Sequence, residues 1–125
     1  MNASQTFIRS LQESEQSHNP EPLLRLFADQ CTLTRLNSDE PYNGRDGAKL
    51  FWDEYLGLFR EIRSRFTNVI ESGNTAVLEW DAEGRFETGE PIHYRGVSIV
   101  EFDGDKVRKF RTYYDSAPFT QHAHA

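Results

Sequence analysis

The chain has 125 residues, with 14 Lys and Arg against 20 Asp and Glu, a net charge of −6 and one cysteine. This length predicts a single domain over residues 1–125, with a hydrophobic core of its own. The acidic balance argues against nucleic acid or a membrane surface as partner, because both bind clustered Lys and Arg. The lone Cys31 excludes an internal disulfide, and no apolar stretch fits a signal peptide or a membrane span, so we expect a cytoplasmic protein.

The first half of the chain has the apolar spacing of three helices. Residues 3–18 carry apolar side chains on one helical face and are predicted to form the first helix. The Asn-Pro pair at 19–20 is typical of a helix start, so a second helix should run to about Asp29. Asp46 can cap a third helix, whose apolar and aromatic positions repeat at helical spacing as far as Phe59.

The other segments alternate like strands and are rich in β-branched and aromatic residues. An Asp-Gly turn at 103–104 predicts a hairpin between the last two strands. After Asp115 no period remains, and residues 116–125 are expected to form a flexible tail. The predicted strands are 31–36, 62–70, 75–85, 92–102 and 106–114. Helices followed by this antiparallel run indicate an α+β fold with three N-terminal helices on one face of a curved, mostly antiparallel sheet.

The pairing of strands 75–85 and 92–102 decides which side chains share a face. A turn centred near residues 88–89 predicts partners whose numbers sum to about 177. One face of the sheet is then apolar. If this face is the outer one, it predicts a homodimer, because a monomer would leave the apolar patch exposed. The predicted dimer contacts are Leu78, Trp80, Val97 and Ile99, with Arg95, Arg111 and Tyr113 at the rim. The alternative is a sheet inverted by one residue, with Trp80 in the core and Glu79 and Asp81 in solvent.

The opposite face then carries two carboxylates, Glu79 and Asp81. They lie two residues apart on one strand, hence about 7 Å apart on the same face. Inside a pocket their mutual repulsion would raise one pKa into the range useful for a general acid or base. They are therefore the candidate catalytic residues, although partners such as Arg35 or a wet pocket mouth would leave them without that role.

Aromatic and small polar residues are predicted to wall this pocket, although an aromatic stripe is more often plain core. The predicted wall consists of Arg35, Trp52, Tyr55, Tyr94, Ser98, Phe110, Thr112 and Tyr114. Such a wall suits a small apolar or aromatic molecule, and we expect Arg35 to pair with Asp81 or Glu79 or to bind an anionic ligand. The four histidines, His18, His93, His122 and His124, do not form a ligand set, so no metal site and no cofactor are expected.

Several short motifs resemble the nuclear transport factor 2-like superfamily, which includes ketosteroid isomerases and SnoaL-like polyketide cyclases. They are Leu26-Phe27-Ala28-Asp29, Gly44, Gly96, Phe102-Asp103-Gly104-Asp105-Lys106-Val107 and Tyr113-Tyr114-Asp115. The resemblance implies a cone-shaped fold that encloses a pocket. It also places Leu11, Arg35 and Ser98 where the isomerases have their catalytic groups, which argues against steroid isomerase activity.

Together these observations predict a SnoaL-like domain that binds a small apolar molecule. Acid-base catalysis by Asp81, of the cyclase, isomerase or hydratase type, would fit the same pocket. The alternative is a binding or dimerisation domain without catalytic groups. Motifs of this kind indicate a fold and leave the reaction open.

Overall fold

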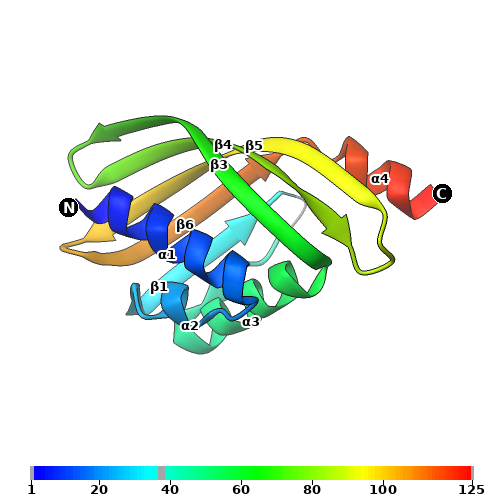
Figure 1. Cartoon of the computed structure of the whole chain (residues 1–125). Helices are drawn as coiled ribbons and strands as arrows, with labels where there is room; N and C mark the ends of the chain where they lie inside the picture. The colour runs from blue at the N-terminus through cyan, green and yellow to red at the C-terminus, as the bar shows by residue number, and fades with distance from the viewer. Residues whose placement is uncertain (1, 37–38, 125) are drawn as a thin grey trace.

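The computed structural model describes residues 2–36 and 39–124. Within these residues four helices and six strands follow one another, and the strands form one sheet in the order β2-β1-β6-β5-β4-β3. The elements are α1 (Ala3–Ser17), α2 (Glu21–Leu24), β1 (Phe27–Arg35), β2 (Tyr42–Asn43), α3 (Gly44–Gly57), β3 (Phe59–Ser72), β4 (Thr75–Phe86), β5 (Pro91–Asp103), β6 (Lys106–Tyr114) and α4 (Ala117–His124). Helices α1 to α3 lie on one side of the bent sheet (Figure 1). The predicted α+β class, with three N-terminal helices on a curved sheet, is confirmed.

Helix α1 begins with a capping box that the sequence encodes locally. The side chain of Asn2 accepts a hydrogen bond from the backbone N–H of Gln5 at 2.9 Å, and the Gln5 side chain accepts from the N–H of Asn2 at 3.3 Å. These bonds satisfy two donors that have no partner inside the helix. The helix ends at Ser17 and is followed by His18, whose φ of 56° lies in the left-handed region. The backbone N–H of His18 caps it by donating to the carbonyl of Ser14.

The second helix is much shorter than predicted. It ends at Leu24, and Phe27 already belongs to β1. Backbone pairing explains the difference, because Val107 donates its N–H to the Leu26 carbonyl at 2.7 Å and β1 then runs parallel to β6. Tertiary contacts here override a sequence that locally suits a helix.

The pairing of β4 with β5 differs by one residue from the prediction. Trp80 lies opposite Gly96, and Leu78 lies opposite Ser98, so the partner numbers sum to 176. Leu78 and Trp80 therefore point inward and are 0% and 8% exposed. The absence of a side chain at Gly96 makes room for the indole, since a Cβ there would lie 2.4 Å from Trp80 Cζ2.

This register corrects the predicted dimer surface and the predicted catalytic pair. Leu78 and Trp80 belong to the interior, so they form no outer contact. Glu79 and Asp81 share the outer face with Val97 and Arg95, as the inverted alternative proposed for this strand. A one-residue slip moves every side chain of a strand to the other face. The inward assignment of β5 and β6 holds, because Ser98 and Thr112 are buried beside each other.

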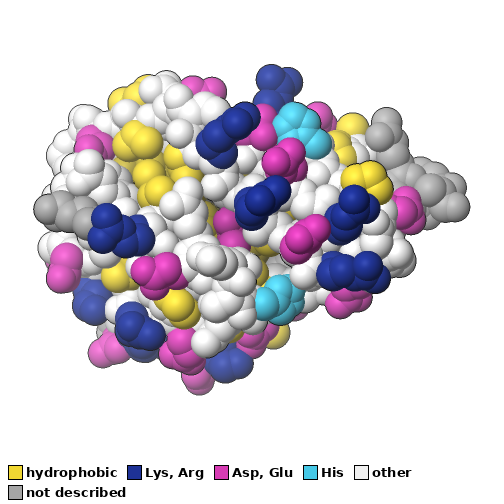
Figure 2. All heavy atoms as spheres, in the orientation of Figure 1, with side chains coloured by type: hydrophobic (Ala, Val, Ile, Leu, Met, Phe, Trp, Pro, Cys, Tyr) yellow, Lys and Arg dark blue, Asp and Glu magenta, His cyan; other side chains and the backbone are white. Residues whose placement is uncertain are grey.

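The core lies between the helices and the concave face of the sheet and continues to the far end of β3 and β4. Phe7 of α1, Phe51 and Trp52 of α3 and Phe110 of β6 form its centre, with ring centroids 5.2–5.8 Å apart where they meet Phe110. Charged side chains of both signs alternate on the surface shown in Figure 2. Exposed pairs of this kind stabilise a fold only weakly.

Helix α4 occupies the segment in which only a flexible tail was expected. The side chain of Asp115 accepts a hydrogen bond from the backbone N–H of Ala117 at 3.0 Å. Phe119 then packs against Tyr94, with ring centroids 4.8 Å apart, and against Phe86 at 5.8 Å. Phe119 is a single aromatic contact and creates no apolar periodicity, which is why the sequence pattern did not predict this helix.

Candidate functional site

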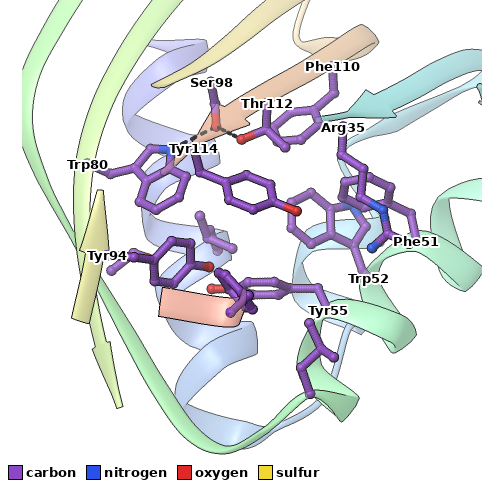
Figure 3. Close-up of a pocket in the computed structure, with 14 residues that line it drawn as sticks. Arg35, Phe51, Trp52, Tyr55, Trp80, Tyr94, Ser98, Phe110, Thr112 and Tyr114 are labelled. Carbon is purple, nitrogen blue, oxygen red and sulfur yellow. Dashed lines mark hydrogen bonds between the residues drawn. The ribbon is translucent and has the colours of Figure 1, made fainter. Parts of the chain in front are cut away.

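A cavity of about 60 Å³ lies between the helices and the concave face of the sheet. Its wall is mostly aromatic and draws on every element from α1 to α4 except α2 and β2. The structure places all eight predicted wall residues around this cavity (Figure 3). The wall also contains Leu11, Phe51, Leu58, Ser64, Trp80 and Phe119, of which Trp80 had been assigned to the outer face.

One part of the wall is a closed polar network. Trp80 donates its indole N–H to the Ser98 hydroxyl at 2.9 Å, and the hydroxyls of Ser98 and Thr112 are 3.0 Å apart. Ser98 and Thr112 are 5% and 8% exposed. Because these polar groups already have partners, a ligand gains little by competing for them.

Trp52 contributes a donor without a partner. It lines the cavity from α3, is 4% exposed, and its indole N–H has no acceptor among the described residues. Leaving such a donor unpaired in the interior costs about 1–3 kcal/mol. A ligand oxygen that reached this N–H would recover that cost.

Arg35 lies at the wall with a partner that the sequence did not suggest. Its guanidinium is 3.3 Å from the Glu54 carboxylate and donates to the Tyr42 hydroxyl at 3.0 Å. It also stacks over the ring of Phe51, 5.7 Å from the centroid. The predicted pairing of Arg35 with Asp81 or Glu79 is therefore wrong, because both of those carboxylates lie on the far face of the sheet.

The two candidate catalytic carboxylates are held on the outer face. His93 Nε2 lies 2.7 Å from Asp81 Oδ1, and Arg65 lies 4.0 Å from the same atom. Glu79 accepts a hydrogen bond from the Asn68 side chain at 3.0 Å. Neither carboxylate lines the cavity, so the structure does not bring them together with the predicted wall.

The carboxylate next to the cavity is Glu15 of α1. It is 5% exposed and accepts hydrogen bonds from the Tyr55 hydroxyl at 2.8 Å, the Ser64 backbone N–H at 2.9 Å and the Ser64 hydroxyl at 2.6 Å. Burial raises the pKa of Glu15 above its ordinary value, and the three hydrogen bonds oppose that shift. The sequence carried a signal, since Glu15 follows Phe7 and Leu11 at intervals of four on the apolar helix face.

Two tyrosine hydroxyls link this carboxylate to the cavity. Tyr55 and Tyr94 both line the wall, and Figure 3 shows their hydroxyl groups beside each other. Burial is the largest cause that raises the pKa of each phenol, and the charge of Glu15 raises both further. Both hydroxyls therefore stay protonated at neutral pH and act as hydrogen-bonding groups.

Among the side chains that the structure describes, in residues 2–36 and 39–120, no group of three or more His, Cys, Asp and Glu is arranged to hold a metal ion. No helix in the same part of the chain is long and apolar enough to cross a membrane.

Comparison with known proteins gives a family and a fold. A family model described as a SnoaL-like domain matches residues 8–110. An NTF2-like protein from Anabaena variabilis superposes with a TM-score of 0.85 at 20% identity, covering 93% of this chain and 89% of that one. A protein with a ketosteroid isomerase-like fold from Catenulispora acidiphila, in complex with trimethylamine, has a TM-score of 0.81 at 16% identity, covering 94% and 92%. TerC, co-crystallised with polyporic acid, has a TM-score of 0.80 at 14% identity, covering 98% and 96%. No curated protein sequence matches the chain.

Proposed function

Because the chain belongs to the SnoaL-like domain family, we propose that its cavity binds a small, largely apolar molecule that carries a hydrogen-bond acceptor. The unpartnered indole N–H of Trp52 is the observation that carries this proposal. The surrounding aromatic rings supply apolar contact, and the acceptor would fix the orientation of the ligand. An apolar wall that also carries a hydrogen-bonding group distinguishes a ligand site from plain core.

The size of the cavity limits the ligand. About 60 Å³ is well below the 300–1,000 Å³ or so of sites for drug-sized molecules. The ligands named for two proteins of the same fold, trimethylamine and polyporic acid, are both small organic molecules. They support the class of ligand proposed for this chain.

Acid-base catalysis of the cyclase, isomerase or hydratase type is a second candidate function. The observation that favours it is Glu15, a buried carboxylate whose hydrogen-bond partners Tyr55 and Ser64 both line the cavity. The rival is a binding or dimerisation domain without catalytic groups. Turnover of a bound ligand that is lost in Glu15→Gln would favour catalysis, and binding without any product would favour the rival.

We propose a homodimer through the outer face of the sheet, on a smaller surface than the sequence indicated. Val97 and Ile99 remain on that face, and Val77 and Ile70 extend the row across β4 and β3. Tyr113, 47% exposed, lies opposite Val97 on β6. Arg95 and Arg111 share the face and would supply rim contacts. The cytoplasmic location also stays a prediction.

The Trp52→Phe variant tests the ligand proposal, because it removes the indole N–H and keeps an aromatic ring. Calorimetric titration with benzaldehyde, which has an acceptor, and toluene, which has none, separates the polar contact from changes in packing. Benzaldehyde should bind roughly tenfold more weakly to the variant, while toluene changes little. Equal changes for both probes would show that the N–H has no role in binding.

A further inference from the structure

The hydrogen bonds around Glu15 fix the proton positions at one end of the cavity. The Ser64 backbone N–H, the Ser64 hydroxyl and the Tyr55 hydroxyl all point to the two oxygens of this carboxylate. A backbone N–H can only donate, and a serine or tyrosine hydroxyl has a single proton to give. With Glu15 ionised, all three groups donate to it.

Tyr55 is therefore left as an acceptor toward the cavity. Its one proton is committed to Glu15 Oε2 at 2.8 Å, and its oxygen keeps a lone pair beside the hydroxyl of Tyr94. Tyr94 keeps its own proton, because burial raises its pKa above the ordinary value, and its hydroxyl is hydrogen-bonded to Tyr55. Without a ligand the Tyr94 proton can serve the oxygen of Tyr55, so a ligand hydroxyl would enter between these two groups, which Figure 3 shows beside each other.

We propose that this pair binds a hydroxyl group of the ligand, as in a phenol or an enol. The ligand O–H donates to the oxygen of Tyr55, and the ligand oxygen accepts from the hydroxyl of Tyr94. Glu15 acts through Tyr55 as a positioning residue, because it holds the Tyr55 proton away from the cavity. The inference rests on the proposed ligand site and narrows its ligand class.

A carbonyl or ether ligand fits this end less well. Such a group only accepts, so it can pair with Tyr94 but leaves the oxygen of Tyr55 without a donor. An unpaired polar atom in a buried site is costly, whereas a hydroxyl ligand satisfies both tyrosines. The preference depends on the charge of Glu15, because a protonated Glu15 can donate to Tyr55 and release the Tyr55 proton toward the cavity.

Several polar and charged groups surround Glu15, so a change of pH would alter more than the proton of this carboxylate. Tyr55 of α3 and Ser64 of β3 contact it directly, and Tyr94 of β5 interacts with its charge. An outer groove reaches the same carboxylate and is also lined by His18, which caps α1, and by Arg60, Glu61 and Arg63 of β3. A substitution at Glu15 is therefore a cleaner perturbation than pH alone.

The test compares the affinities of phenol, benzaldehyde and toluene by calorimetric titration at neutral pH. Wild-type protein should bind phenol roughly tenfold more tightly than toluene, and more tightly than benzaldehyde. In Glu15→Gln the amide can donate to Tyr55, whose own proton then faces the cavity. The ratio of phenol to benzaldehyde affinity should fall by roughly tenfold.

The ratio separates this role from a structural one. Damage to the fold would weaken all three probes together and leave their ratios unchanged. Tyr55→Phe, which removes the acceptor, should also lower the preference for phenol over toluene, whereas Gln16→Ala in the outer groove should preserve it. Equal binding of phenol and toluene by the wild type, or an unchanged ratio in Glu15→Gln, overturns this inference and leaves the ligand site standing. Failure of all three probes to bind counts against the ligand site itself and removes this inference with it.

Discussion

Replacing Gly96 by alanine tests the packing that determines which face of β4 looks inward. A Cβ at this position would lie 2.4 Å and 2.7 Å from two indole carbons of Trp80 and 2.6 Å from the Tyr113 carbonyl oxygen. Ordinary contacts begin near 3.4 Å, so the indole has to move by about 1 Å. That movement also strains the 2.9 Å hydrogen bond from Trp80 to Ser98.

The expected loss combines these two effects. Overpacking a dense core costs about 1–3 kcal/mol, and the weakened hydrogen bond adds about 1 kcal/mol. Gly96→Ala should therefore lower the free energy of unfolding by about 2–4 kcal/mol. At an unfolding entropy near 2.1 cal/mol/K per residue, a chain of 125 residues should lose about 8–15 °C in Tm.

Urea denaturation followed by far-UV circular dichroism measures this loss. The matched control is Gly57→Ala at the end of α3, where a new Cβ would have no neighbour within 4 Å. That control should be neutral or more stable by up to about 1 kcal/mol. In a Trp80→Phe background, which lacks the clashing ring carbons, Gly96→Ala should cost less. A Gly96→Ala variant as stable as Gly57→Ala would refute the assignment of Trp80 to the inner face.

Three further predictions follow from the cavity and the outer face. Burial raises the pKa of Glu15 above 4.5, so its contribution to stability is complete below pH 4.5 and is lost as the pH rises through the raised value. Wild type should therefore lose stability relative to Glu15→Gln over this interval in urea titrations, and a constant difference would contradict the raised pKa. Phe119→Ala removes a ring that lines the cavity, so it should lower the free energy of unfolding by about 2–4 kcal/mol and admit larger aromatic probes. If the variant binds the same sizes of probe as the wild type, α4 does not limit the cavity. Val97→Asp should convert a dimer to a folded monomer in light scattering, and a monomeric wild type would end the dimer proposal.

The sequence predicted the strands better than their pairing. β-branched and aromatic runs marked β4, β5 and β6 to within one or two residues, because that composition is what a half-buried strand requires. Register depends on turn geometry, and a shift from a sum of 177 to 176 reversed the face of β4. Gly96 could have indicated the correct register, because only a position without a side chain accommodates the indole of Trp80 opposite it.

The residues of the cavity wall were predicted correctly where the period of a single strand or helix determines which side chains point inward. Ser98, Thr112 and Tyr114 follow the period of two on β5 and β6, and Trp52 and Tyr55 follow the helical period of α3. The acid beside the cavity was missed because a glutamate in an amphipathic helix usually faces water. Its position on the apolar helix face was a signal for burial, and its hydrogen bonds with Tyr55 and Ser64, which the sequence does not reveal, explain how a carboxylate is accommodated there.

The parallel pairing of β1 with β6 has a consequence for how the chain acquires its structure. Thr32 and Leu33 pair with Lys109 and Phe110, so β1 finds its long partner strand only after β6, the last strand, has been synthesised. Phe110 also completes the ring cluster around Phe51 and Trp52. During synthesis helices α1 to α3 and β1 thus emerge from the ribosome before the strand that covers their apolar faces. Contacts so distant in the chain slow folding, and a fragment that lacks β6 should remain unfolded and prone to aggregate.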